Sequence, residues 1–165
     1  MHRDPREATA IGNRGGGIGV YGSVEETIKP AVAIEWDTFF NPQRLDNGQD
    51  RIHMVQVNED ASLVELAQTV DDDNVDIRTG DDGNTVGRMW VDYNCNGNKQ
   101  LEVRLNNNGS FRPTFPTLSI TAALEDFFFP NGDNGIVYVG YTASIGGQAD
   151  NHDIFGWEFN TGCSA

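Results

Sequence analysis

Basic residues are scarce in this chain of 165 residues. Lys and Arg number 11 against 25 Asp and Glu, which gives a formal net charge of −14. Nucleic acids and anionic membrane surfaces attract clusters of Lys and Arg, so we expect neither as a partner. An acidic surface favours solubility, and its carboxylates can also bind cations. The net charge does not argue against neutral ligands such as sugars.

Long apolar runs are missing as well. No stretch approaches the roughly 20 apolar residues of a membrane-spanning helix, so we expect no membrane insertion. The first ten residues, MHRDPREATA, are charged and lack the apolar region of a signal peptide. Such a start is typical of a cytosolic protein or of a chain that lacks its original N-terminus. Cys95 and Cys163 are the two cysteines, and they permit one disulfide without demanding it.

Short strands punctuated by turn residues make up most of the chain. Runs of β-branched and aromatic residues predict strands at Ala31–Phe39, Ile52–Val57, Val86–Tyr93, Leu101–Leu105, Ile136–Ser144 and Asp153–Phe159. Ala61–Gln68 fits either a helical turn or a strand, and Thr121–Phe129 fits a short helical turn that Pro130 ends. Without an internal repeat or a linker, the pattern predicts one all-β domain over residues 1–165, a β-sandwich or jelly roll.

The segment Val32–Asn58 holds ionisable residues inside a predicted strand. Glu35 and Asp37 alternate with apolar residues, so their carboxylates lie on the same side of the strand. Two neighbouring carboxylates repel each other, so this side needs a cation, protons or a basic partner. The strand contains no Lys or Arg, and the next basic residue along the chain is Arg44.

Further metal-ligand types follow these two carboxylates. Hard oxygen ligands from Asp37, Asn41, Asp46 and a backbone carbonyl would suit Ca²⁺. Glu35, Asp37, Asp46 and one nitrogen of His53 would suit Mn²⁺ or a similar transition ion. A solvated acidic turn beside an unrelated strand histidine explains the same residues, because motif matches of this kind often arise by chance.

Four stretches, in the same order along the chain, resemble legume-type (L-type) lectins. AVAIEWDTFFN, followed by an Asp and a His, is similar to their metal-binding segment, and NRGGGIGVYG resembles the glycine-rich sugar-binding loop before it. MWVDYNCNGNKQLEVRL resembles a pair of back-sheet strands, and VYVGYTASIGGQADNHDIFGWEF resembles the closing strands with the specificity loop. The resemblance covers nearly the whole chain, and the opening HRDPREATAIG has a bacterial rather than a plant character.

The resemblance implies a concanavalin A-like jelly-roll sandwich with two adjacent metal ions near one end. The transition ion would be held by Glu35, Asp37, Asp46 and His53. The Ca²⁺ ion would be held by Asp37, the carbonyl of Phe39, Asn41 and Asp46. The metals would order the acidic loop and so lower the cost of binding a sugar.

The family binds sugar through an Asp, an Asn, a glycine N–H and a stacked aromatic ring. A glycine serves as the donor because only glycine lets the backbone approach a sugar ring closely. The matching positions here are Asn41, one of Gly15, Gly16 and Gly17, the specificity loop Gly146, Gly147 and Gln148, and Phe39 or Phe40 as the ring. Phe39 fits the position of the ring better.

Two features depart from the family's pattern. The Ala-Asp-Gly segment with the family's sugar-binding Asp is not found upstream of the glycine loop, so we expect the N-terminal strands and that Asp to be missing from this chain. His53 also lies further from Asp46 than is usual, with Asp50 between them. Asp50 is therefore the alternative to Asp46 as the bridging ligand, and Ca²⁺ is the better supported ion.

We therefore expect a calcium-dependent carbohydrate-binding domain that is secreted or lies at the cell surface. Its partners would be glycans or glycoconjugates, and its sheet edges would allow a homodimer. Glucanases that share the jelly roll need a further Glu after Glu-x-Asp, whereas Thr38, Phe39 and Phe40 stand there, so no enzymatic activity is expected. A structural or adhesion module that has lost sugar binding is the alternative, and a glucanase is the weaker one.

Overall fold

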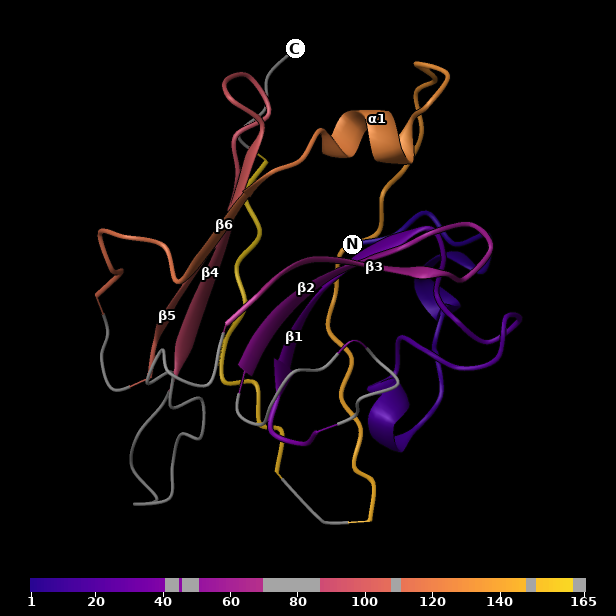
Figure 1. Ribbon diagram of the computed structural model, residues 1–165, viewed down its shortest axis with the longest axis horizontal. Helices are drawn as coiled ribbons and strands as arrows, with labels where there is room; N and C mark the ends of the chain where they lie inside the picture. The colour runs from indigo at the N-terminus through magenta and orange to yellow at the C-terminus, as the bar shows by residue number, and fades with distance from the viewer. Residues whose placement is uncertain (41–44, 46–50, 70–86, 108–110, 148–150, 162–165) are drawn as a thin grey trace.

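The computed structural model describes residues 1–40, 45, 51–69, 87–107, 111–147 and 151–161. Two antiparallel sheets of three strands each form its centre (Figure 1). The first sheet has the order β1 (Ala31–Asp37), β2 (Arg51–Val57), β3 (Leu63–Gln68), and the second has the order β4 (Arg88–Tyr93), β5 (Gln100–Asn106), β6 (Leu118–Thr121). The short 3₁₀ turns η1 (Glu7–Thr9) and η2 (Gly15–Gly17) precede β1, and the helix α1 (Leu124–Phe128) follows β6.

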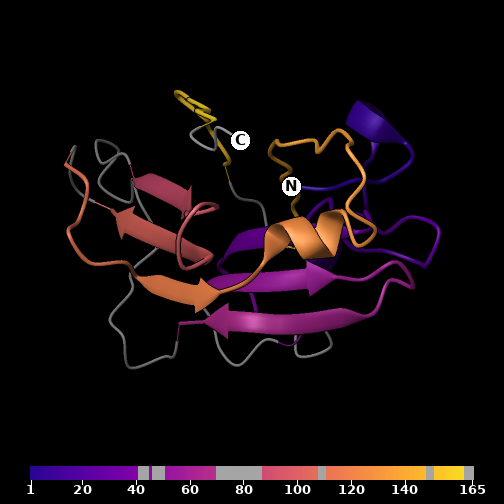
Figure 2. The same ribbon diagram turned by 90° about the horizontal axis from the view of Figure 1, so that it is seen from above.

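The main apolar core lies between the two sheets and α1. Alternate side chains of β1 and β2 meet alternate side chains of β5 there, because successive strand residues point to opposite faces. Its fully buried members are Val32, Ile52, Met54, Leu101, Val103, Leu124 and Phe128. α1 follows β6 and lies above the first sheet in Figure 1, so that it overlaps β2 in the view from above (Figure 2); its buried residues Leu124 and Phe128 join one end of this core.

A second buried cluster covers the opposite face of the first sheet. It consists of Tyr21 and Ile28 from the N-terminal segment, Ala31 of β1, and Val55 and Val57 of β2. The register pairs Ala31 with Val57 and Ala33 with Val55. The N-terminal segment is therefore packed onto the face of β1 that also carries Glu35 and Asp37.

Most of the expected elements are confirmed with small changes of bounds. The strands expected at Ala31–Phe39, Ile52–Val57, Val86–Tyr93 and Leu101–Leu105 correspond to β1, β2, β4 and β5. The ambiguous segment Ala61–Gln68 forms β3, and α1 lies inside the expected helical turn. β6 was not expected, because its four residues are too short a run to give a periodic pattern.

The two expected closing strands, Ile136–Ser144 and Asp153–Phe159, are wrong for the described residues. Only Tyr138 forms a bridge, through reciprocal backbone hydrogen bonds with His2. High β-propensity yields a strand only where a neighbouring backbone completes a ladder. Tyr141 and Trp157 form an edge-to-face ring contact at 5.5 Å, and both rings are more than half exposed, so this pair lies outside the core.

Cys95 takes part in a disulfide, and the only other cysteine of the sequence is Cys163, which lies outside the described residues. No helix in the described part of the chain is long and apolar enough to span a membrane.

Candidate functional site

The two loops expected to contact a sugar lie next to each other. Thr142 donates a hydrogen bond from Oγ1 to the carbonyl of Ile18 at 2.8 Å, and Ser144 donates one from Oγ to the carbonyl of Gly15, also at 2.8 Å. A Cβ added at Gly15 would lie 3.6 Å from the Cα of Gly146. The structure thus brings the glycine loop and the start of the expected specificity loop together.

The backbone of the glycine loop contains two consecutive residues in the left-handed region. Gly19 has a φ of +75°, and Ile18 before it has a φ of +43° as the residue that ends η2. A β-branched residue rarely adopts such a φ, so Ile18 is a strained position. Strain of this kind persists only where surrounding contacts hold the backbone, and the Thr142 bond to Ile18 is one such contact.

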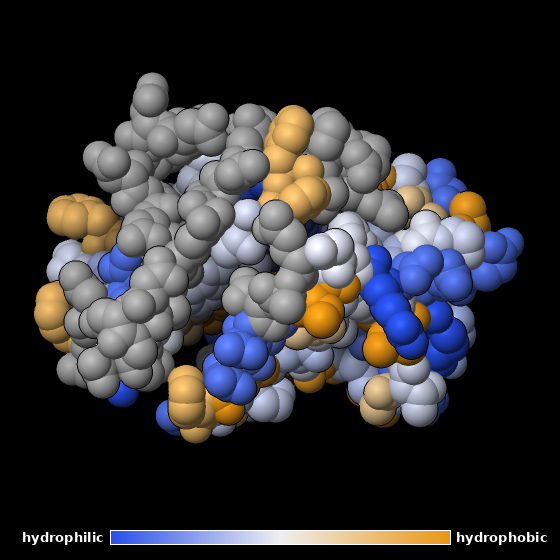
Figure 3. Space-filling model, turned by 90° about the horizontal axis from the view of Figure 1, so that it is seen from below, coloured by the Kyte–Doolittle hydropathy of each residue, from blue (hydrophilic) through white to orange (hydrophobic). Residues whose placement is uncertain are grey.

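Exposed apolar side chains lie near the same end of the molecule. In Figure 1, the end of β1, the η2 turn and residues 142–147 all lie in the lower half of the view. Figure 3 looks onto this end, where apolar side chains form separate patches among polar ones. Phe39 is 54% exposed just after β1, and Phe40 and Ile145 are exposed as well. An exposed ring beside a polar loop could stack under a sugar.

Glu35 and Asp37 face two basic side chains across the first sheet. The register places Glu35 opposite His53 and Asp37 opposite Arg51. All four residues are buried, with between 0% and 8% of their surface exposed. Of the three alternatives that the sequence left open, a basic partner is present on the neighbouring strand, at Arg51 and His53.

Asp37 is held from two directions. Nη2 of Arg51 lies 2.8 Å from Oδ2 of Asp37, and the backbone N–H of Phe39 donates to Oδ1 at 2.8 Å. The second bond turns the chain back on itself directly after β1, as an Asx turn does. The backbone of Phe39 is consequently close to the Asp37 carboxylate.

Glu35 is also surrounded by polar partners. The hydroxyl of Tyr21 donates a hydrogen bond to Oε1 of Glu35, and Nδ1 of His53 lies 3.6 Å from Oε2. On the other side of the imidazole, Nε2 of His53 lies 3.9 Å from Oε2 of Glu65. Tyr21 thus connects the N-terminal segment to the polar end of the face on which Glu35 and Asp37 lie.

These residues fit the two expected metal ions differently. The Asp37 carboxylate and the nearby Phe39 backbone are oxygen donors suited to Ca²⁺. Of the four ligands expected for the transition ion, Asp46 lies outside the described residues, and at Asp37 the Arg51 guanidinium lies 2.8 Å from Oδ2, on the side that faces His53 and its strand. Within the described ranges, no group of three or more His, Cys, Asp or Glu side chains is arranged to hold a metal. The predicted ligands Asn41 and Asp46, their alternative Asp50, and the predicted sugar contact Gln148 lie outside the described residues.

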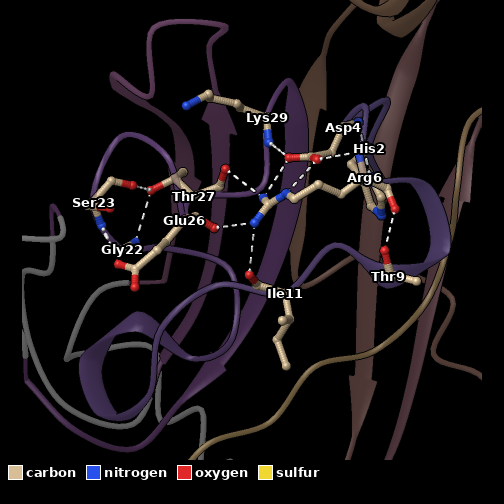
Figure 4. A network of polar contacts seen from close by, with 10 residues as sticks. All are labelled: His2, Asp4, Arg6, Thr9, Ile11, Gly22, Ser23, Glu26, Thr27 and Lys29. Atoms are coloured by element: carbon tan, nitrogen blue, oxygen red, sulfur yellow. Dashed lines mark hydrogen bonds and ion pairs between the residues drawn. The ribbon is translucent and has the colours of Figure 1, made fainter.

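The ion pair between Arg6 and Asp4 holds both ends of the glycine loop, Asn13–Gly22 (Figure 4). Arg6 donates through Nε and Nη2 to the Asp4 carboxylate, and through Nη1 and Nη2 to the carbonyls of Ile11, Glu26 and Thr27. All five N–H groups of the guanidinium are thereby used. The three carbonyls lie just before and just after the loop, so Arg6 fixes its two ends relative to each other.

The Asp4 carboxylate, like the Arg6 guanidinium, has several hydrogen-bond partners. It also accepts hydrogen bonds from the backbone N–H groups of Arg6 and Lys29, at 2.9 Å each. Burial would raise the pKa of the Asp4 carboxyl, but the hydrogen bonds from the Arg6 side chain and from these backbone N–H groups outweigh burial and lower it. Asp4 is therefore held in its charged form.

Sequence reasoning missed Tyr21, Arg51 and the Asp4–Arg6 pair. One signal was available for Arg51, because it lies two residues before His53 and so shares its side of the strand. The register that sets Arg51 opposite Asp37 depends on the hairpin as a whole and could not be read from either strand alone.

Comparisons with known proteins agree with this arrangement. A family model described as the legume lectin domain matches residues 4–165. Among similar Arabidopsis thaliana proteins, L-type lectin-domain containing receptor kinase V.2 is 31% identical over 121 residues, or 69% of this chain. Receptor kinase S.7 of the same group is 28% identical over 158 residues, or 92% of this chain. The chain spans 17% and 21% of the length of these two relatives, respectively.

The bacterial character expected from the opening residues finds no support in these plant relatives. The family match is to a non-catalytic domain, in agreement with the missing second carboxylate after Asp37. Since the match extends over nearly the whole chain, from the Asp4–Arg6 pair through the glycine loop and both sheets, this chain belongs to the legume lectin domain family, and its sheets are those of a concanavalin A-like β-sandwich.

Proposed function

We propose that this domain binds carbohydrate at the end of the sandwich where the glycine loop meets residues 142–147. The observation that carries the proposal is the pair of hydrogen bonds from Thr142 and Ser144 to the loop carbonyls of Ile18 and Gly15. These bonds join segments that lie more than 120 residues apart in the sequence.

The proposed contacts follow from the chemistry of sugars. Hydroxyl groups both donate and accept hydrogen bonds, so the backbone N–H of Gly16, the amides of Asn41 and Gln148, and the backbone at Gly147 would orient the ring. Gly17, the other expected donor, fits less well, because it is buried and its N–H donates to the carbonyl of Arg14 at 3.1 Å. The half-exposed ring of Phe39 would stack against its apolar face. Phe40 is the alternative ring.

We further propose that binding depends on Ca²⁺, held by Asp37, the Phe39 carbonyl, Asn41 and Asp46, with Asp50 as the alternative to Asp46. Asp37 supports this role because its carboxylate and the Phe39 backbone are already joined by a hydrogen bond. When bound, the ion would hold the segment after β1 in one geometry, which lowers the ordering cost of binding a sugar.

A glycan array with purified protein, in Ca²⁺ and then in EDTA, tests the proposal. We expect binding to one group of glycans in Ca²⁺ and its loss in EDTA without loss of the fold. Phe39→Ala should weaken binding at least about 10-fold, since a buried aromatic contact with a ligand contributes a kilocalorie or more per mole. Phe115→Ala is the matched control, because Phe115 is also exposed but follows β5 in the second sheet.

A structural or adhesion module is the second candidate. The Asp37–Arg51 pair favours it, because this pair neutralises part of the acidic face without any ligand. Binding to no glycan in either condition would support this candidate, whereas release of sugar products would indicate a glucanase.

We also propose a secreted or cell-surface location. The disulfide at Cys95 supports it, since disulfides persist mainly in oxidising compartments. Glycans or glycoconjugates would then be the partners. We also propose that the domain can form a homodimer through its sheet edges.

A further inference from the structure

Arg51 is a permanent cation in the interior of the first sheet. Its surface is 1% exposed, and its guanidinium lies 2.8 Å from the carboxylate of Asp37. A guanidinium does not lose its proton in proteins. The positive charge on this face is therefore built into the chain and does not depend on a dissolved ion.

We infer that Arg51 takes the place of a transition-metal ion between the strands β1 and β2, so that this face of the sheet is complete without Mn²⁺ or a similar ion. The inference holds whether or not the domain binds a glycan. It concerns only the transition-metal position, at Oδ2 of Asp37 between the strands; the proposed Ca²⁺ position would lie on the other side of the carboxylate, toward Oδ1 and the Phe39 backbone.

The charges across the sheet support this inference. In the register of β1 and β2, Asp37 lies opposite Arg51 and Glu35 lies opposite His53. Glu35 is further satisfied by the Tyr21 hydroxyl. A divalent cation that used Asp37 and His53 would lie close to the guanidinium in a poorly screened interior, where like charges repel strongly.

The side chains around Arg51 differ from those around the other buried arginine of the described sheets. Arg104 is the other buried arginine of the described sheets, and it pairs with Asp92 at 3.0 Å and Glu102 at 2.8 Å. Those two acids are directly opposite each other on β4 and β5, without an imidazole beside them. Removal of Arg51, in contrast, would allow the two carboxylates and the imidazole of this face to approach one another, and these are the ligand types that a transition ion uses.

Calorimetric titration of the purified protein with MnCl₂, in buffer that contains Ca²⁺ and no glycan, tests the inference. We expect no saturable Mn²⁺ binding to the wild type and no change in its unfolding temperature. Arg51→Gln should gain one saturable Mn²⁺ site, and its unfolding temperature should rise when the ion is added. Arg51→Gln with His53→Ala should lose that gain, and Arg104→Gln, the matched control, should show none.

Saturable binding of Mn²⁺ to the wild type that His53→Ala abolishes would overturn the inference. A folded Arg51→Gln variant that gains no site would also overturn it, because Arg51 would then not be what excludes the ion. If Arg51→Gln fails to fold, Arg51→Lys keeps the charge: Mn²⁺ excluded as in the wild type supports the inference, and Mn²⁺ bound contradicts it. A failed glycan array has no effect on any of these outcomes, since they are measured without sugar.

Discussion

The side chain of Ser144 donates a hydrogen bond of 2.8 Å to the carbonyl of Gly15, across 129 residues of sequence. Together with the Thr142 bond to Ile18, it fastens the glycine loop to the segment that follows Tyr138. Gly19 borders this contact, because a Cβ added at Gly19 would lie 2.8 Å from Cβ of Thr142.

Gly19→Ala should lower the unfolding free energy by more than the positive φ at this position alone would cause. Gly19 has a φ of +75°, and a Cβ there would lie 2.8 Å from Cβ of Thr142. Gly132→Ala is the matched control, because Gly132 has a φ of +66° with no atom within 4 Å of the added Cβ. We expect a loss of about 1 kcal/mol in the unfolding free energy for Gly132→Ala and of about 1–3 kcal/mol more for Gly19→Ala. Urea unfolding measures both losses, and equal losses would contradict the close approach.

Arg6→Gln should destabilise the domain and loosen the glycine loop. The variant leaves the buried Asp4 carboxylate without its guanidinium and deprives the carbonyls of Ile11, Glu26 and Thr27 of their donors. Leaving a buried carboxylate without its cation is costly, but the Arg6 side chain itself is 34% exposed, so we expect a loss of about 2 kcal/mol. Hydrogen exchange should rise at the amides of residues 11–28.

Arg112→Gln is the control for this variant. Arg112 also pairs with an Asp, at 2.6 Å to Asp92, but both side chains are substantially exposed. Its loss should stay below about 1 kcal/mol. An Arg6→Gln loss as small as that of Arg112→Gln would show that the Asp4–Arg6 pair does not hold the loop.

Asp4 should contribute to acid unfolding. Because its pKa is lower in the folded protein than the ordinary value of 3.8, its stabilising effect is complete above that value and is lost as the pH falls below it. Stability of the wild type should therefore decline between about pH 5 and pH 2 more steeply than that of Asp4→Asn. Urea midpoints at each pH measure the slopes, with Asp153→Asn, at an exposed position outside every strand and helix, as the control. Parallel slopes for wild type and Asp4→Asn would refute the role of Asp4.

Tyr93 should make the domain sensitive to alkaline pH. Burial, and a hydrogen bond from its hydroxyl to the Glu125 carboxylate, raise the pKa of Tyr93 to about 12. The folded state therefore holds this proton more tightly than the unfolded state, whose value is 10.0, and stability is lost as the pH rises between these values. Tyr93→Phe should show a shallower decline in unfolding free energy above about pH 10. A decline as steep as that of the wild type would assign the alkaline loss to other groups.

The local elements of this fold could be predicted because they depend on local patterns. Alternation along Ala31–Asp37 placed Glu35 and Asp37 on one side of a strand, and the Gly-rich run NRGGGIGVYG marked a loop. The same alternation predicted that the two carboxylates need a compensating charge, because neighbouring negative charges repel each other in any fold.

The partners across space could not be predicted in the same way. Arg51 neutralises Asp37 because a hairpin register sets them opposite each other, and a shift of one residue would have turned Arg51 to the other face. The expected strand at residues 136–144 has the right composition, yet its backbone pairs only at Tyr138, because a ladder needs a neighbour that the segment itself does not contain. Composition and alternation thus decide which residues lie on a shared face, whereas register and long-range packing decide which charge, loop or backbone they meet there.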